Sequence, residues 1–472
     1  MIEQNNKDGL LALIRKGQPM TLRQQLKLTV QLSLPAIMAQ LSTILMQYID
    51  SSMVGSLGAQ ASASIGLIST TTWLFWGICS AAATGFSVQV AHFIGAGNKA
   101  AARNVLRQSF LATFLLSATL MIIGCSISDV LPFWLGGTQE IAKDSSSYFF
   151  IFSLSLPILQ INFLAGSMLR CSGNMRIPSI LNILMCIFDV LFNAVLIFPP
   201  RTIEILGTNI FIPGADMGVT GAAIGTALAE FLTAISMLGF LCFKSSELKL
   251  TQDHGRFKPT SQCISKALHI GFPMGIEHIV LCGAQIMITM IVAPLGTTAI
   301  AANAFGIIVE SLCYMPGYGI ADAATTLVGQ SYGACRKDLT RRFARISVFL
   351  GIVIMTIMGI IMYVASPAIM SIMTPDPEVQ SLSVMALRIE AFAEPMFAAS
   401  IVAYGVFVGT GKTLVPSIMN LVSIWAVRLT LAASLAPVMG LKGVWIAMCI
   451  ELCFRGFIFL IHLKREQWMK SM

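Results

Sequence analysis

Long stretches without any charged residue constrain the fold of this chain more than any other feature. Four examples cover residues 28–49, 108–128, 145–169 and 347–375. A run of 18 or more mostly apolar residues is long enough to cross the hydrocarbon core of a bilayer as a helix. Only 11% of the residues are charged, whereas soluble domains carry roughly 25%. The sequence therefore predicts a polytopic membrane protein and excludes a water-soluble enzyme.

The apolar segments predict an all-α protein with twelve transmembrane helices. Each segment reaches the roughly 20 residues that a spanning helix needs. They lie near residues 30–50, 61–91, 108–128, 147–169, 178–199, 217–243, 267–293, 298–328, 346–367, 388–408, 414–437 and 441–463. The polar N-terminus has no short apolar run before a cleavage site and so does not resemble a signal peptide. We interpret residues 18–27 as a lead-in helix before the first span.

The positions of Lys and Arg predict the orientation, because loops on the cytoplasmic side are enriched in these residues. With the N-terminus inside, 24 of the 30 basic residues fall in inside segments, three fall in outside loops and three in helices. The formal net charge of +8 is therefore a topology signal and not a nucleic-acid-binding surface. We expect a multi-pass protein of the cell membrane with both termini in the cytoplasm.

The sequence also contains an internal repeat at a constant offset of 238 residues. Prolines and glycines impose backbone geometry, so a repeated set of them indicates a repeated backbone. The matched pairs are Pro35 with Pro273, Pro157 with Pro395, Pro178 with Pro416, Gly95 with Gly333 and Gly173 with Gly411. Two six-helix halves in the same orientation are related by an axis along the membrane normal and enclose a central cavity.

The repeat divides the chain into five parts. We expect a cytoplasmic N-terminal segment (1–27), an N-lobe (28–243), a cytoplasmic linker (244–265), a C-lobe (266–463) and a cytoplasmic tail (464–472). After the fifth span the offset falls to 222, because Met217 and Gly218 pair with Met439 and Gly440. The N-lobe therefore carries extra residues around 199–216.

Acidic residues within the predicted spans are the candidate functional groups. A charge at the bilayer centre costs at least about 2.5–3.5 kcal/mol and usually marks an ion or substrate path. Asp189 lies midway along its span, with Asn193 one helical turn later and Asn182 two turns earlier. A carboxylate flanked by amides can hold Na+ or accept a proton. Asp50 and Gln40 of the first span complete this candidate cation-binding set, and a purely structural hydrogen-bonded role is the alternative for each acid.

Other acids and large side chains are candidates for the cavity between the lobes. Glu230 is central in the sixth span and either serves the cavity or makes a buried interhelical hydrogen bond. In the C-lobe, Glu277, Glu390 and Glu394 either face the cavity or relay protons, or they neutralise nearby arginines such as Arg428 and Arg455. A cavity lined by aromatic and Met side chains suits flat organic cations. The candidate lining residues are Tyr48, Phe163, Met287, Tyr314 and Met315.

The ordered motifs resemble those of the multidrug and toxic compound extrusion (MATE) family, of the MOP flippase superfamily, over nearly the whole chain. In the first half they are DSSMVGSLG (50–58), GAGN (95–98), RCSGN (170–174) and MGVTGAA (217–223). In the second half they are PLG (294–296), PGYG (316–319), TLVGQ (326–330) and GTGKT (409–413). Each motif alone is weak, but their order within a chain of two six-helix halves is specific.

The resemblance implies an antiporter that exports organic, often cationic compounds by alternating access, driven by inward movement of Na+ or H+. It places a cation site in the N-lobe, at acids of the first and fifth helices, and Asp50 matches the first-helix acid. The family often has Asn followed four residues later by Asp on the fifth helix, whereas Asp189 precedes Asn193 here. We expect no cofactor besides the coupling ion and a protein that works as a monomer in the lipid bilayer.

Three alternatives remain open on the sequence. A lipid-linked precursor flippase or a specific-metabolite exporter would keep the fold and change the cargo. A membrane-embedded enzyme is disfavoured because the sequence has no HExxH or GxGD motif. A channel is disfavoured because no selectivity-filter loop is visible.

The eleven cysteines lie mostly in apolar segments without a CxxC pair, so neither a zinc site nor a disulfide framework is expected.

Overall fold

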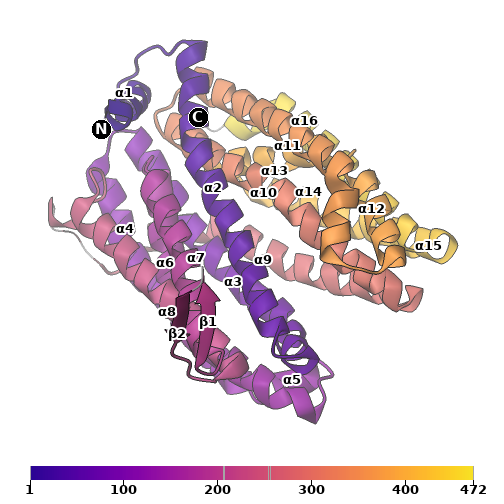
Figure 1. Cartoon of the computed structure of the whole chain (residues 1–472). Helices are drawn as coiled ribbons and strands as arrows, with labels where there is room; N and C mark the ends of the chain where they lie inside the picture. Colours follow the sequence, from indigo (N-terminus) through magenta and orange to yellow (C-terminus); the bar gives the residue numbers. More distant parts are fainter. Residues whose placement is uncertain (1, 206–207, 253–254, 256, 471–472) are drawn as a thin grey trace.

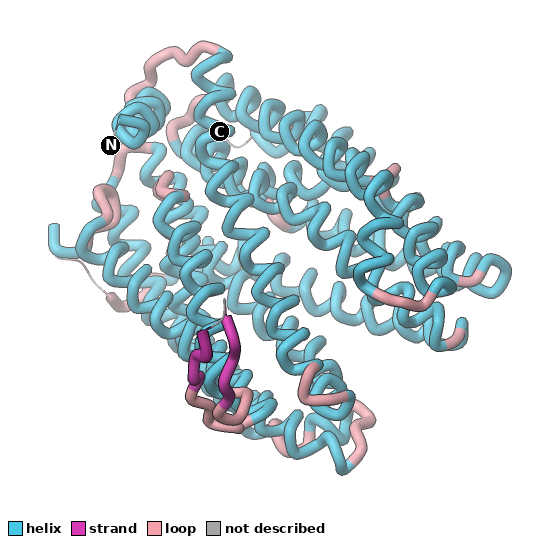
Figure 2. Tube along the Cα trace, viewed as in Figure 1, coloured by secondary structure: helices cyan, strands magenta, loops and turns pink. Residues whose placement is uncertain are grey.

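The protein is a bundle of long helices with a single β-hairpin (Figure 2). The structure, a computed structural model, describes residues 2–205, 208–252, 255 and 257–470. Within this part of the chain, 11 helices are long and apolar enough to cross a membrane, and one bent pair of helices provides a twelfth span. The prediction of twelve transmembrane helices is confirmed.

The first six spans form the N-lobe. They are α2 (Leu22–Gly55), α3 (Ala59–Gly95), α4 (Lys99–Ile127), α6 (Gln139–Cys171), α7 (Arg176–Leu196) and α8 (Gly218–Gly239), which continues into a π-helical turn, Phe240–Lys244. The short helix α5 (Leu131–Trp134) links α4 to α6. The extra residues of this half hold two antiparallel strands, β1 (Arg201–Ile205) and β2 (Thr208–Ile212), with Arg201 opposite Ile212.

The last six spans form the C-lobe. They are α9 (Ser261–Val292, followed by a 3-10 turn, Ala293–Leu295), α10 (Thr297–Gly333), α11 (Lys337–Met373), the bent pair α12 (Pro377–Glu390) and α13 (Glu394–Gly409), α14 (Leu414–Val422) with α15 (Thr430–Met439), and α16 (Leu441–Arg465). A π-helical segment, Ser423–Leu429, joins α14 to α15 within one span. Short 3-10 turns lie at Leu250–Gln252 and Gln467–Met469.

The tenth predicted span, 388–408, is not a single helix. Its chain bends by 59° between α12 and α13. Pro395 stands in the first turn of α13. N–H groups in the first turn of a helix have no carbonyl partner within the helix, so proline costs no hydrogen bond at this position. The break places Glu390 and Glu394 on either side of the bend.

The predicted lead-in helix at residues 18–27 is wrong in its position. A separate helix, α1 (Ile2–Arg15), precedes the first span, and residues 22–27 already belong to α2. Thr21 begins α2 with a capping box, in which its side chain accepts from the Gln24 backbone N–H and Gln24 accepts from the Thr21 N–H. Gly17 has a φ of 71° and Pro19 follows it, so the helical pattern stops before this cap.

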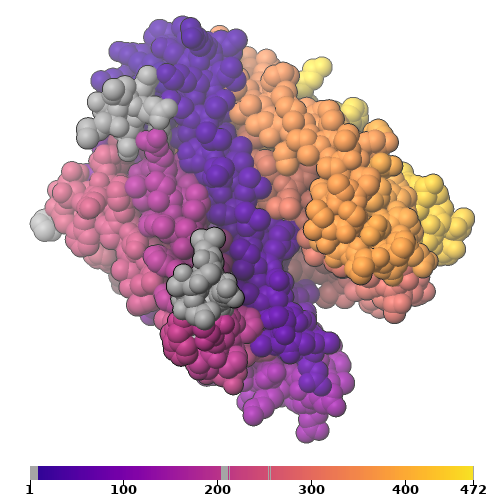
Figure 3. Space-filling view, viewed as in Figure 1, coloured from indigo at the N-terminus to yellow at the C-terminus, as the bar shows by residue number. Residues whose placement is uncertain are grey.

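The two lobes meet mainly through four helices, with α2 packed on α10 and α3 packed on α9. Small residues allow close backbone approach, as is common between membrane helices. A Cβ at Gly319 of α10 would lie 2.5 Å from the Ile37 nitrogen, and one at Gly85 of α3 would lie 2.4 Å from the Ala267 oxygen. The lobes converge at one end of the bundle and diverge toward the other (Figure 1). Figure 3 shows the same division, with the indigo α2 running along the boundary.

We call the converging end the basic end. Both chain termini lie there (Figure 1), and so do the contacts of the basic side chains Arg15, Lys99 and Arg336 that are described below. Leu10, Leu11 and Ile14 of α1 are buried in a cluster that also contains Met175 of the N-lobe and Phe343 of the C-lobe. Helix α1 therefore rests on both lobes and covers their junction.

Candidate cation site and substrate cavity

Three polar side chains of the N-lobe meet between α2 and α7. Asn193 Nδ2 donates to Asp50 Oδ1 at 2.9 Å and to Asp189 Oδ2 at 3.1 Å. Asp189 and Asn193 are completely buried. Asp50 and Asp189 also interact electrostatically with each other, and Asp189 interacts with Thr226 of α8. The spacing of Asp189 and Asn193 by four residues puts both on one face of α7.

This cluster has the chemistry of a site for a small cation. Two carboxylates at this separation repel unless a proton or a cation lies between them. Within the described chain, Asp189 Oδ1 and Asn193 Oδ1 are buried without a hydrogen-bond partner, so both oxygens are available as ligands. Gly225 of α8 makes room for them, since a Cβ there would lie 2.0 Å from Asn193 Oδ1. Oxygen ligands of this kind suit a hard cation, and a carboxyl pair equally suits a proton.

Two residues that the sequence grouped with this cluster lie elsewhere. Gln40 and Asn182 line the central cavity, and Gln40 donates to Asp322 of α10 at 3.3 Å. Both are correctly placed on α2 and α7, but they lie away from the level of Asp50 and Asp189. Sequence spacing shows which face of a helix a residue shares, and it cannot show at which depth two helices contact each other.

A cavity of about 380 Å³ lies between the lobes. Side chains of both halves line it, and they include three carboxylates: Glu230 on α8, Glu277 on α9 and Asp322 on α10. Trp76 and Phe163 contribute aromatic rings from the N-lobe, and Tyr318 and Tyr404 from the C-lobe. Asn182 and Asn420, which are equivalent in the repeat, both reach the cavity.

Two of the three carboxylates of the cavity have partners. Tyr404 donates to Glu277 Oε2 at 2.6 Å, and Asn420 donates to Glu277 Oε1 at 2.6 Å. Asp322 accepts from Gln40 and lies 3.9 Å from the Arg170 Nε of the other lobe. Glu277 thus connects α9, α13 and α14, and Asp322 links the two lobes across the inner wall of the cavity.

Of the five large side chains predicted to line the cavity, only Phe163 does so. Tyr48 instead donates to the Ile308 carbonyl oxygen of α10 at 2.6 Å and contacts the Ser311 hydroxyl. Tyr314 packs edge-on against Phe397. The cavity lining defined above contains neither Met287 nor Met315. Residue type alone does not distinguish a cavity wall from a helix contact.

The C-lobe contains a buried ion-pair group around Glu451. Its carboxylate lies 2.7 Å from Arg428 and 2.8 Å from Arg455, and Ser423 donates to it at 2.6 Å. Glu451 is fully buried. Glu451 therefore neutralises these two arginines. This is one of the roles that the sequence predicted for the acids in the C-lobe. Glu390 and Glu394 are also fully buried, and their oxygens have no hydrogen-bond partner among the described residues.

The comparisons with known proteins agree with this architecture. A sequence model of the MatE family matches residues 35–195 and 273–433. The chain belongs to the MATE family. The two matched segments are offset by the same 238 residues as the repeat. The chain is therefore a membrane transporter of this family and not an enzyme.

Individual relatives cover almost the whole chain. A protein of Thermotoga maritima named "Probable multidrug resistance protein NorM" is 30% identical over 93% of this chain and 92% of its own length. A "FAD transporter" of Shewanella oneidensis is 23% identical over 91% of this chain and 92% of its own. The crystal structure of a MATE protein in complex with MaL6 is 20% identical, covers 98% of this chain and 99% of its own, and superposes with a TM-score of 0.87.

The MATE repeat produces a symmetric closure at the basic end, which sequence reasoning missed. His92 Nε2 hydrogen-bonds the Gly409 carbonyl oxygen at 2.8 Å, and Gln330 Nε2 donates to the Cys171 carbonyl oxygen at 2.9 Å. These two contacts are equivalent, because His92 matches Gln330 and Cys171 matches Gly409 at the offset of 238. The sequence contained a signal for them, since the glycines next to these residues repeat at the same offset.

A second group of contacts at the basic end joins α1 to both lobes. Arg15 donates to Glu247 Oε1 at 2.7 Å, and Lys99 lies 3.0 Å from Glu247 Oε2. On the other side, Arg336 of the C-lobe donates to the Leu13 carbonyl oxygen of α1 at 3.4 Å and to the Gln18 carbonyl oxygen just after α1 at 2.6 Å. Burial acts to raise the pKa of Glu247, but the charges and hydrogen bonds of Arg15 and Lys99 outweigh it, so the pKa lies below its usual value.

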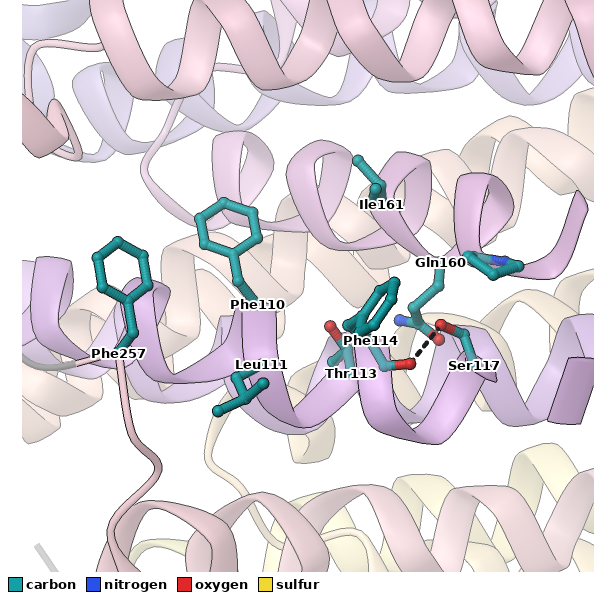
Figure 4. Close-up of a pocket in the computed structure, with 9 residues that line it drawn as sticks. Phe110, Leu111, Thr113, Phe114, Ser117, Gln160, Ile161 and Phe257 are labelled. Atoms are coloured by element: carbon teal, nitrogen blue, oxygen red, sulfur yellow. Dashed lines mark hydrogen bonds between the residues drawn. The ribbon is translucent and has the colours of Figure 1, made fainter. Parts of the chain in front are cut away.

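A second pocket, of about 360 Å³, lies on the other side of α6 (Figure 4). Phe110, Phe114 and Ile161 line it with other mostly apolar side chains. It shares no lining residue with the central cavity. We therefore assign the candidate substrate site to the central cavity.

Proposed function

We propose that this MATE protein is a secondary antiporter that exports organic, cationic compounds in exchange for Na+ or H+. The observation that carries the proposal is the bridge from Asp50 through Asn193 to Asp189, which leaves buried oxygens free for a cation beside the interlobe cavity. The relatives named multidrug resistance proteins support drugs as the exported compounds.

The cation site and the lobe interface share one helix, and this supplies the coupling. Helix α2 carries Asp50, and the same helix contacts α10 through Ile37 and Tyr48. A cation held between Asp50 and Asp189 adds attraction between α2 and α7. Pro35 lies inside α2, where it removes one backbone hydrogen bond and provides a point of bending. Movement of α2 toward α7 changes its contact with α10 and the shape of the cavity.

Alternating access follows from this arrangement. The lobes here are closed at the basic end, which the charge distribution predicts to be cytoplasmic, and diverge toward the opposite side. In this conformation a substrate leaves outward and a cation enters. Return to the inward-open conformation requires the two repeat-related bonds of His92 and Gln330 to break, and the lobes then rock about the cavity as in other repeat-built transporters.

A second candidate function is the export of a specific anionic metabolite. Two arginines, Arg170 and Arg455, line the cavity, and one relative is named a FAD transporter. Both arginines already have acidic neighbours, Asp322 and Glu451, which favours the organic-cation proposal.

Transport by purified protein in proteoliposomes tests the proposal. Ethidium or norfloxacin efflux is measured while the Na+ and the proton gradients are collapsed separately. We expect efflux to stop when one of the two gradients is removed and to be abolished by Asp189→Asn. Glu140→Gln serves as the matched control, because Glu140 is exposed at the end of the bundle away from the termini. Gradient-independent efflux, or full transport by Asp189→Asn, would contradict the proposal.

A further inference from the structure

Glu230 is the unpaired carboxylate of the central cavity. The other two lining carboxylates have partners, as described above for Glu277 and Asp322. Glu230 is only half-buried, and no described side chain donates a hydrogen bond or forms an ion pair with it. A carboxylate in an apolar membrane segment without a partner is costly. A bound positive charge would remove that cost.

Two aromatic rings lie in the same layer of the cavity. Trp76 and Phe163 meet edge to face, with ring centroids 4.9 Å apart and an interplanar angle of 84°. Trp76 is 40% exposed, although both rings line the cavity. The face of an indole is the best surface in proteins for a cation.

Glu230 lines the same cavity as the two rings and also comes from the N-lobe. Cys79, one turn after Trp76 on α3, is within electrostatic range of Glu230. The carbonyl oxygen of Cys79 accepts a hydrogen bond from Gln160 at 3.2 Å, and Gln160 is one turn before Phe163 on α6. Helices α3, α6 and α8 thus bring Trp76, Phe163 and Glu230 to the N-lobe side of one cavity.

Glu230 is also adjacent to the candidate cation site. Asp189 interacts electrostatically with Glu230 and also interacts with Thr226, one turn earlier than Glu230 on α8. Asp189 is fully buried, so water screens its charge poorly and a charge at either position affects the other. A coupling cation at Asp50 and Asp189 would repel a positive charge held at Glu230.

We propose that Glu230, Trp76 and Phe163 form the subsite that holds the positively charged aromatic group of the substrate. The proposal rests on the proposed export function and names the part of the cavity that recognises the charge. Cation entry at Asp50 and Asp189 weakens this subsite through charge repulsion, and the substrate is released outward. By linkage, bound substrate weakens the cation site by the same factor.

Equilibrium binding to purified protein in nanodiscs, without any gradient, tests the subsite. The probes are ethidium, a permanent aromatic cation, and Nile red, an uncharged aromatic dye. We expect Glu230→Gln to raise the ethidium Kd about tenfold, equivalent to about 1.4 kcal/mol, and to leave the Nile red Kd within twofold. Trp76→Ala should weaken both dyes, whereas Trp76→Phe should retain most of the affinity. An ethidium Kd within twofold of the wild type in Glu230→Gln would overturn the subsite.

The wild-type protein provides a measurement that does not depend on folding of a variant. Its ethidium Kd should rise when the coupling ion, Na+ or protons, is raised to saturation, and this rise should disappear in Asp189→Asn. A Kd that stays constant under both ions would refute the competition.

If the wild type exports ethidium under a gradient but Glu230→Gln binds it normally, the subsite proposal is refuted and the proposed export function stands. If the wild type neither binds nor exports ethidium, the proposed function fails with it.

Discussion

Closure of the basic end depends on two glycines that the repeat places opposite each other. A Cβ added to Gly95 of α3 would lie 2.0 Å from the Gln330 carbonyl oxygen, and one added to Gly333 of α10 would lie 2.0 Å from the His92 carbonyl oxygen. Side-chain Cβ atoms essentially never approach other atoms to less than 3.0 Å. Gly95→Ala therefore requires α3 and α10 to separate by about 1 Å at this point, because backbone atoms cannot move aside singly.

The magnitude follows from the bonds that such a separation breaks. The hydrogen bonds from His92 to Gly409 and from Gln330 to Cys171 lie in the same contact. Each contributes about 1 kcal/mol, so the closed conformation loses about 2 kcal/mol relative to conformations in which the basic end is open. This corresponds to a roughly 30-fold change in the equilibrium between them. Gly333→Ala should have the same effect, because the contact is symmetric.

Hydrogen exchange of the backbone amides at the ends of α3 and α10 measures this opening. We expect faster exchange around residues 92–98 and 330–336 in Gly95→Ala and Gly333→Ala, with unchanged exchange at the opposite end of the bundle. Gly66→Ala is the matched control, since Gly66 lies in the same helix and a Cβ there meets nothing within 4 Å. Gly95→Ala protein that exchanges and transports like the control would refute the role of this contact.

Two further predictions concern ion pairs. Arg15→Gln should lower thermal stability by about 2 kcal/mol, and this loss should depend on pH. The pKa of Glu247 is lower in the folded protein than in the unfolded chain, so its ion pair is fully stabilising at neutral pH and is lost as the pH falls. The difference between wild type and variant in melting curves should therefore shrink as the pH falls below about 4.3, the ordinary value for Glu, and vanish once the pH is below the pKa of Glu247 in the folded protein. A difference that does not depend on pH would contradict this. Glu451→Gln leaves Arg428 and Arg455 buried beside a neutral amide, which should cost about 3 kcal/mol. An unchanged melting temperature in the same detergent would show that the arginines are solvated in another way.

Much of the architecture follows from the sequence. Apolar segment length gives twelve spans because a helix must cross a fixed thickness of hydrocarbon. The offset of 238 residues gives two equivalent halves because Pro and Gly constrain the backbone in the same way in each half. The cost of burying charge in lipid pointed to Asp50, Asp189 and Glu230, and the structure brings the first two together. The predicted position of the lead-in helix was wrong because the amphipathic pattern of α1 covers only a few residues near the start of the sequence.

The tertiary structure alone decided how these elements contact one another. Periodicity assigns a residue to a face of its helix, but it does not give the depth at which two helices cross. This is why Gln40 and Asn182 lie in the cavity and not with Asp189, and why Tyr48 bonds α10. Partners also depend on packing. Glu277 accepts hydrogen bonds from Tyr404 and Asn420, whereas Glu230 lines the cavity without a partner among the residues that the structure describes. The sequence alone identified the acidic residues that are costly to bury in a membrane, and the fold determined which of them are left free to bind a charge.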